Sequence, residues 1–261
     1  MLADFQFLLI AFSLVLPRTL VCLVILPGIG LNAMTGATRA GVAAAVALPA
    51  LLPAFLAVRD APPDMLHGMA LVFKEALIGL VMGVLLGIPL WVLQAIGSIL
   101  DTQRSPIPIA GANPNDQDSS GTGSVMLQAG VMIMIQGGLI LALVNTLIES
   151  YGTWPAMQLA PAFDVVKAET VLRRFGELLW HVVVYGAPLL IPLLLVDFAL
   201  GAIGIFAPSL QVSVASSPIK SLLGLFILIA YWATLSHHIG GDFARLLDLI
   251  REVFGAPPRS S

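Results

Sequence analysis

Residues 76–100 read ALIGLVMGVLLGIPLWVLQAIGSIL, a stretch without a single charged side chain. It is long enough to cross a bilayer, because a helix needs about 20 apolar residues to span the roughly 30 Å hydrocarbon core. Its length and its lack of alternating polarity favour a helix over a strand. The whole chain has the same character, since 58% of its 261 residues are hydrophobic and only 10% are charged. The composition therefore predicts an all-helical, multi-helix membrane protein.

Similar runs without charge follow one another along the chain. They cover residues 19–38, 41–58, 125–148, 178–196, 198–219 and 221–241. Together the runs predict about six membrane-length helices or helical hairpins. Residues 1–31 are expected to be a retained membrane segment rather than a signal peptide. Asp4 replaces the usual basic start of such a peptide, and Arg18 interrupts the apolar run.

Two features of the quoted stretch bear on packing. Gly79, Gly83 and Gly87 recur every fourth residue, a spacing that lets two helix backbones approach closely. Lys74 and Glu75 stand directly before the stretch. Charges near the end of a membrane helix usually extend to the lipid interface, which is the first interpretation of this pair. The alternative is an ion pair buried against a neighbouring subunit.

Prolines spaced four residues apart occur in two runs, Pro49 with Pro53 and Pro188 with Pro192. Proline removes a backbone donor and kinks a helix, and membrane helices tolerate this where neighbouring groups satisfy the freed carbonyls. The pairs are compatible with kinked helices packed in a bundle, or with bent hairpins in a curved assembly.

Asp197 is an acid between two long apolar runs. A carboxylate at the centre of a bilayer costs roughly 2.5–3.5 kcal/mol on insertion scales, so it needs a partner, a water-filled cavity or a polar boundary. A structural hydrogen-bonding role is favoured. A proton relay is the alternative, although His181 is the one other ionisable group noted at a similar depth.

Three segments are more polar. Residues 101–124 read DTQRSPIPIAGANPNDQDSSGTGS, which predicts a long loop of the kind that is often functional. An interfacial helix is expected within residues 149–177. Residues 242–254 predict an amphipathic helix that docks on a partner or on the membrane surface. Its apolar positions are Phe243, Leu246, Leu247, Ile250 and Phe254.

Motifs that carry catalysis are missing from the sequence: there is no nucleophile elbow, phosphate loop or HExxH. His237 and His238 are adjacent, so on a helix they point about 100° apart and do not readily share a metal ion. The net charge of −3 argues against nucleic acid as a partner, and Cys22 is the single cysteine. No enzyme activity, catalytic residue, cofactor or metal site is predicted.

The order and spacing of several short motifs resemble one family, the FliR/SpaR/YscT/HrcT family of type III secretion export-apparatus proteins, also called T subunits. The Pro-Ile-Lys-Ser motif resembles the virulence branch more than the flagellar branch. Ser105, Ser209 and Gln211 depart from the family pattern. The matching positions are residues 74–79, Gln94, Gly97, residues 100–104, Asn113, Pro114, Pro188, Asp197, Gly201, residues 207–212 and residues 217–221.

The resemblance implies a non-enzymatic component of a protein-export pore in the bacterial inner membrane, with bent hairpins largely at the periplasmic level. Its implied partners are R-, S- and U-type export subunits, the base of the needle or inner rod, unfolded secreted proteins in transit, and membrane lipid. Residues 1–177 would correspond to an R-type subunit and residues 178–261 to an S-type hairpin.

The resemblance also assigns roles to particular residues. The loop would act as a plug in the closed channel, through Arg104, Pro106, Pro108, Gly111, Asn113, Pro114 and Gly121. Hairpin bends and buried polar positions would be Pro188, Pro192, Asp197, Pro208, Pro218 and Lys220.

Two other classes of protein stay open on residues alone. A secondary transporter for a small solute needs polar groups at the membrane midplane, for which Asp197, Gln94 and Gln136 are candidates. An intramembrane protease needs paired catalytic groups at depth, and Asp197 has no obvious second member.

Overall fold

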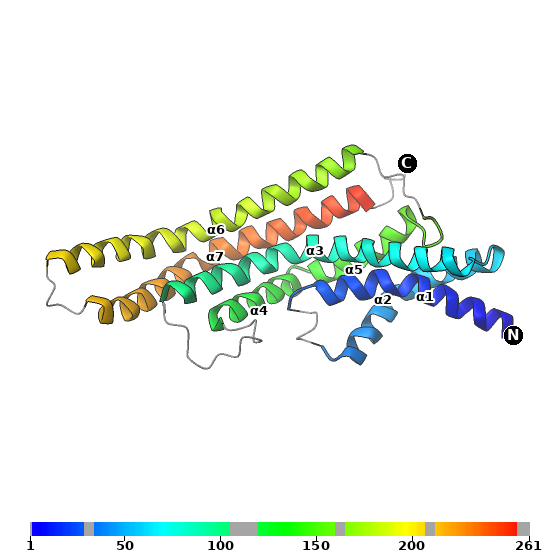
Figure 1. Ribbon diagram of the computed structural model, residues 1–261, viewed down its shortest axis with the longest axis horizontal. Coiled ribbons are helices and arrows are strands. Elements are labelled where there is room, and N and C mark those ends of the chain that lie inside the picture. The colour runs from blue at the N-terminus through cyan, green and yellow to red at the C-terminus, as the bar shows by residue number, and fades with distance from the viewer. Residues whose placement is uncertain (1, 29–33, 105–119, 160–164, 207–211, 255–261) are drawn as a thin grey trace. The chain divides into compact units, whose positions relative to one another are not determined.

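The structure is a computed structural model that describes residues 2–28, 34–104, 120–159, 165–206 and 212–254. Over these ranges the regular structure is helical and contains no strand, which confirms the predicted all-helical fold. The helices, shown in Figure 1, are α1 (Leu2–Ile25), α2 (Gly36–Asp60), α3 (Met65–Arg104), α4 (Gly121–Gln136), α5 (Leu139–Thr153), α6 (Val165–Phe206) and α7 (Val212–Phe254).

Five of these helices are long and apolar enough to cross a membrane, namely α1, α2, α3, α6 and α7. The pair formed by α4 and α5 brings the number of candidate spans to six if the pair is one broken span. This agrees with the prediction of about six membrane-length helices.

The first helix differs from the predicted run of residues 19–38. It begins at Leu2 and ends at Ile25, so Arg18 lies inside it. Gly28 follows the helix with a φ of 78°, a left-handed conformation that glycine adopts without the cost of a Cβ clash. The expected membrane segment of residues 1–31 did include Arg18, and this side chain is fully buried in the interior of the protein.

The run 125–148 was expected to be continuous, but the chain bends between α4 and α5. Gly138 caps the start of α5 in the left-handed region, with a φ of 67°. The Gly137–Gly138 dipeptide is the local signal for this break.

The predicted boundary at Asp197 is also wrong. Helix α6 runs without interruption through Pro188, Pro192 and Asp197 and ends at Phe206. Helix α7 begins at Val212 and contains Pro218. Pro188 and Pro192 both lie inside α6, and their predicted role as bends stays a prediction. Pro188 lies on an exposed side of its helix, where the ring is accommodated without disturbing packed neighbours.

The chain divides into two compact units, each assembled from segments that are distant in sequence. The first unit contains Met1–Ile88, Met134–Phe175 and Asp242–Ser261. The second contains Pro89–Ile133 and Gly176–Gly241. Residues 1–177 were expected to correspond to an R-type subunit and residues 178–261 to an S-type hairpin. This correspondence is a comparison with other proteins, and it stays a prediction.

In the first unit, α1 packs against α2 (Figure 1). The contact runs along a line of small side chains of α2. The buried residues of α2 recur at helical spacing and all but one are alanine, which lets the two backbones lie close together. They are Ala43, Ala47, Ala50, Ala54 and Val58. The hydroxyl of Thr19 in α1 donates a hydrogen bond to the Ala43 carbonyl at 3.1 Å.

In the second unit, α6 and α7 form an antiparallel helical hairpin (Figure 1). Lys220 of α7 pairs with Asp197 of α6, and the space at Gly224 is bordered by Leu193. The contact moves back along α6 from Asp197 to Leu193 as it moves forward along α7 from Lys220 to Gly224, as an antiparallel arrangement requires.

The polar segments near α6 and α7 belong to longer helices than predicted. Residues 165–177, within the expected interfacial helix, are the beginning of α6. Residues 242–254 are the last turns of α7 and not a separate helix. The predicted apolar face is confirmed at Phe243, Leu246, Leu247 and Ile250, which are buried, while the side chain of Phe254 lies outside the described part of the chain. Asp242 was expected on the polar face but is also buried.

Candidate functional site

A buried ion pair joins α1 to α3 in the first unit. The Arg18 guanidinium donates from Nε to Glu75 Oε2 at 2.7 Å and from Nη2 to Glu75 Oε1 at 2.9 Å. Both side chains are fully buried. Two parallel charge-assisted hydrogen bonds of this kind fix the orientation of both groups as well as their distance.

The remaining donors of Arg18 reach α5 and the turn after it. Nη1 donates to Ser150 Oγ at 2.9 Å, and Nη2 donates to the Trp154 carbonyl at 3.0 Å. The guanidinium lies 4.1 Å from the centre of the Tyr151 ring, and the Tyr151 hydroxyl donates to the Val15 carbonyl at 2.7 Å. Arg18 therefore connects three helices through one side chain.

Lys74 is held in the same cluster. Its Nζ lies 2.7 Å from Glu75 Oε1 and donates to the carbonyls of Pro155, Ala156 and Gln158 at 2.9–3.2 Å. The two cations of the cluster exceed its one anion, and main-chain carbonyl dipoles stabilise the excess positive charge. The pair therefore lies inside α3 rather than at its end, and it is buried against α1 and the turn after α5 of its own chain.

Two of the glycines of α3, Gly79 and Gly83, lie against the backbone of α1. A Cβ added to Gly79 would overlap the Arg18 carbonyl oxygen, and one added to Gly83 would lie 2.9 Å from the Cys22 carbonyl oxygen. Gly87 is buried one turn further along α3. The contact at Gly79 therefore brings α3 close enough to α1 for Glu75 to reach Arg18.

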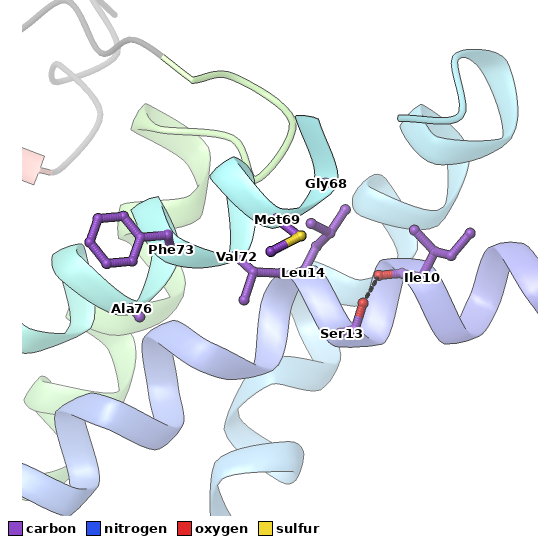
Figure 2. Close-up of a pocket in the computed structure, with 8 residues that line it drawn as sticks. All are labelled: Ile10, Ser13, Leu14, Gly68, Met69, Val72, Phe73 and Ala76. Atoms are coloured by element: carbon purple, nitrogen blue, oxygen red, sulfur yellow. Dashed lines mark hydrogen bonds between the residues drawn. The ribbon is translucent and has the colours of Figure 1, made fainter. Parts of the chain in front are cut away.

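A pocket of about 540 Å³ lies beside this contact, between α1 and α3 (Figure 2). Its one polar side chain, Ser13, donates to the Ile10 carbonyl at 2.8 Å. None of its eight lining residues is titratable, so the pocket is suited to an apolar group and not to catalysis or to a polar solute. The lining residues are Ile10, Ser13, Leu14, Gly68, Met69, Val72, Phe73 and Ala76.

In the second unit, Asp101 connects the end of α3 to the start of α4. Its Oδ2 accepts hydrogen bonds from Ser120 Oγ and from the Thr122 backbone N–H, both at 2.8 Å. Its Oδ1 accepts from Thr122 Oγ1 at 2.5 Å. Ser120 Oγ accepts in turn from the Gly123 N–H at 2.9 Å. We call Asp101, Ser120 and Thr122 the α3–α4 clasp.

The clasp borders the segment that was predicted as a plug. Arg104 is the last residue of α3 and Gly121 is the first residue of α4, so both helices extend into the predicted loop. The other predicted plug residues lie outside the described part of the chain. They are Pro106, Pro108, Gly111, Asn113 and Pro114.

The partner of Asp197 is Lys220, which forms an ion pair with Asp197 Oδ1 across the α6–α7 hairpin. The Lys220 side chain is 10% exposed and that of Asp197 is 38% exposed. The sequence held a signal for this pair, since both residues lie eleven positions from the dipeptide Pro208–Ser209. Pro208 itself lies outside the described residues. His181, considered earlier as a relay partner, instead has its ring centre 5.1 Å from that of Tyr185.

Metal-binding geometry is not found among the residues that the structure describes, where no three His, Cys, Asp or Glu side chains converge. Cys22 is buried and free. The polar groups that do converge are joined to each other or to backbone carbonyls, an arrangement that positions helices.

Comparison with known proteins also supports membership of the export-apparatus family. Residues 9–246 match the family described as bacterial export proteins, family 1. Yop proteins translocation protein T of Yersinia pestis is 34% identical, with 96% of this chain and 97% of that protein aligned. Surface presentation of antigens protein SpaR of Salmonella typhimurium is 28% identical over 80% of this chain and 77% of that protein. Flagellar biosynthetic protein FliR of Caulobacter vibrioides is 26% identical over 91% and 94%.

These matches cover nearly the whole chain, and the apolar helices place it in the inner membrane as a multi-pass protein. The higher identity to a translocation protein than to a flagellar one agrees with the resemblance to the virulence branch. The chain therefore belongs to bacterial export proteins, family 1, the FliR/SpaR/YscT/HrcT family of type III secretion export-apparatus proteins.

Proposed function

We propose that this export-apparatus component forms, together with R- and S-type subunits, the channel through which unfolded proteins leave the cell. The observation that supports this most is the surface of the α6–α7 hairpin. In the most apolar part of α6, 11% of the residues are buried within the chain, whereas 67% are buried in the most apolar part of α3. A surface this apolar requires an external apolar environment.

Neighbouring helices fit that surface better than lipid does. The Asp197 side chain is 38% exposed and lies among exposed apolar residues of α6, including Leu194 and Phe198. A carboxylate that faces lipid is costly even when it is paired on one side, because its free lone pairs have no donor there. A protein partner or an aqueous lumen supplies such donors, and a curved assembly of hairpins supplies both.

The proposed mechanism is geometric. Close contact of α1 and α3 at Gly79 and Gly83, fixed by Arg18 and Glu75, provides a rigid support. The α6–α7 hairpin provides the surface on which R- and S-type subunits assemble. The predicted loop within residues 101–124 acts as the plug of the resting channel, and U-type subunits and the needle or inner-rod base bind around it. Energy for export comes from other subunits.

The test is co-expression with R- and S-type subunits, followed by purification in mild detergent. We expect a stable complex that contains all three proteins. A chain that purifies alone and monodisperse from cells containing all three subunits would contradict the proposed function. Electron microscopy of the complex then shows whether the hairpins lie at the periplasmic level, as proposed.

A further inference from the structure

We infer that Asp101 is a positioning residue that keeps the ends of α3 and α4 together while the segment between them does its work in export. The inference rests on the proposed plug role of that segment. It predicts that the α3–α4 junction stays closed in both the resting and the exporting channel.

The hydrogen bonds of the clasp cap the start of α4 and also join α4 to α3. Ser120 precedes α4 and accepts from the N–H of Gly123, as an N-cap residue does. The Asp101 carboxylate accepts the Thr122 N–H, a second donor that has no partner within its own helix. A carboxylate at this position also interacts favourably with the positive end of the α4 dipole. Asp101 thus caps α4 from α3.

Backbone contact next to the clasp strengthens the junction. A Cβ added to Gly97 of α3 would lie 2.7 Å from the Gly123 backbone and 2.7 Å from the Thr122 carbonyl oxygen. A Cβ added to Gly123 would lie 2.6 Å from Ser98 Oγ. At Gly97 the two backbones meet without an intervening side chain, so the helices cannot separate slightly and still keep this contact.

The contact continues along both helices. The space at Gly130 of α4 is filled by the side chains of Leu90 and Leu93 of α3, each 2.7 Å from the position of an added Cβ. Opening the junction would break three hydrogen bonds to a carboxylate and would also expose this packing.

The sharpest test locks the clasp with a reversible disulfide. The side chains of Asp101 and Thr122 are in direct contact, so the double variant Asp101→Cys with Thr122→Cys places two thiols at the junction. The native Cys22 is replaced by alanine to prevent other pairings. The variant is expressed with R- and S-type subunits, and secretion is measured after oxidation and after reduction.

We expect the disulfide to form and the oxidised apparatus to secrete at least as well as the reduced one, because the bond replaces the clasp. Secretion that is lost on oxidation and recovered on reduction would overturn the inference, since the junction would then have to open. Failure of the two cysteines to cross-link in the assembled complex would overturn it too.

A second variant tests the role of the carboxylate itself. Asp101→Asn keeps the size of the side chain but replaces one accepting oxygen by a donor. We expect a several-fold higher ion leak through the resting complex than in wild type. Thr102→Ala is the matched control, because its hydroxyl donates to the Ser98 carbonyl of its own helix and takes no part in the clasp.

The proposed function and the positioning role of Asp101 would be contradicted by different results. If wild type does not assemble with R- and S-type subunits, the proposed function is wrong. If wild type assembles and Asp101→Asn assembles with an unchanged leak, the positioning role of Asp101 is wrong while the proposed function stands. If Asp101→Asn does not assemble, the disulfide variant decides.

Discussion

Helices α3 and α6 are nearly equal in length and in hydropathy, yet their surroundings differ. Helix α3 has 40 residues and is mostly buried within the chain, whereas α6 has 42 residues and is mostly exposed. What differs is the pattern of small and charged residues. Helix α3 carries glycines that meet other backbones and an acid that pairs with Arg18. Hydropathy thus predicts a membrane-length helix, but contacts between specific residues determine what covers it.

The largest expected effect concerns the charge cluster that holds α3. Replacing Arg18 by alanine leaves Glu75 buried without its bidentate partner, and breaking a buried ion pair on one side typically costs about 3–5 kcal/mol. Thermal unfolding of the purified protein in detergent should show a correspondingly lower midpoint. Arg245→Ala is the control, because its side chain is 75% exposed and pairs with Asp242 at 3.4 Å. Equal stability of the two variants would contradict the role given to Arg18.

The two sides of α6 should respond differently to truncation. Leu193 is fully buried and Phe198 is 76% exposed. Leu193→Ala should lower the free energy of unfolding by about 2–5 kcal/mol, while Phe198→Ala should change it little in the isolated chain. Phe198→Ala should instead reduce the yield of the complex with R- and S-type subunits. A loss of chain stability in Phe198→Ala as large as that in Leu193→Ala would remove the contrast.

Substitutions in the Asp197–Lys220 pair test whether this ion pair stabilises the α6–α7 hairpin. Lys220→Met should destabilise the hairpin by about 1.5–3 kcal/mol, since the acid loses a charged hydrogen-bond partner. Adding Asp197→Asn should recover part of the loss, because no unpaired charge then remains. Chemical unfolding of the single and double variants measures the coupling. Additive effects would show that the two residues act independently.

The smallest expected effect concerns the close approach of α3 to α1. Gly79→Ala should cost about 1–3 kcal/mol, because the added methyl group meets the Arg18 carbonyl and the helices must separate. Gly68→Ala lies on the same helix, where nothing approaches within 4 Å, and should be neutral or slightly stabilising. Unfolding midpoints measured side by side make the comparison. If Gly68→Ala were the more harmful substitution, the packing account of α3 would be wrong.

Much of the fold could be predicted because apolar runs of membrane length leave few alternatives to helices. The boundaries were less predictable: Asp197 separated two predicted runs but lies inside one helix, and the charge-free run that starts at residue 19 belongs to a helix that starts at Leu2. The spacing of Gly79 and Gly83 indicated close packing without indicating the partner, which is α1.

The polar contacts were the least predictable part. Arg18 and Glu75 are 57 residues apart, and no local pattern pairs them. Asp101 lay at the edge of a polar loop, where an acid is ordinarily solvated, and its role as a cap for another helix depends on the tertiary fold. Asp197 and Lys220 were singled out separately, although their equal distance from Pro208–Ser209 would have paired them in a hairpin. The roles of Pro106, Pro108, Gly111, Asn113 and Pro114 as a plug stay predictions.

Site-specific photo-cross-linking tests most directly whether subunits or lipid cover α6. A photoreactive phenylalanine analogue is placed at Phe198 in cells that produce the whole apparatus, with Leu193 as the buried control position. We predict cross-links from position 198 to an R- or S-type subunit and none from position 193 to other proteins. An assembled, secreting apparatus in which position 198 cross-links to lipid alone would contradict the account.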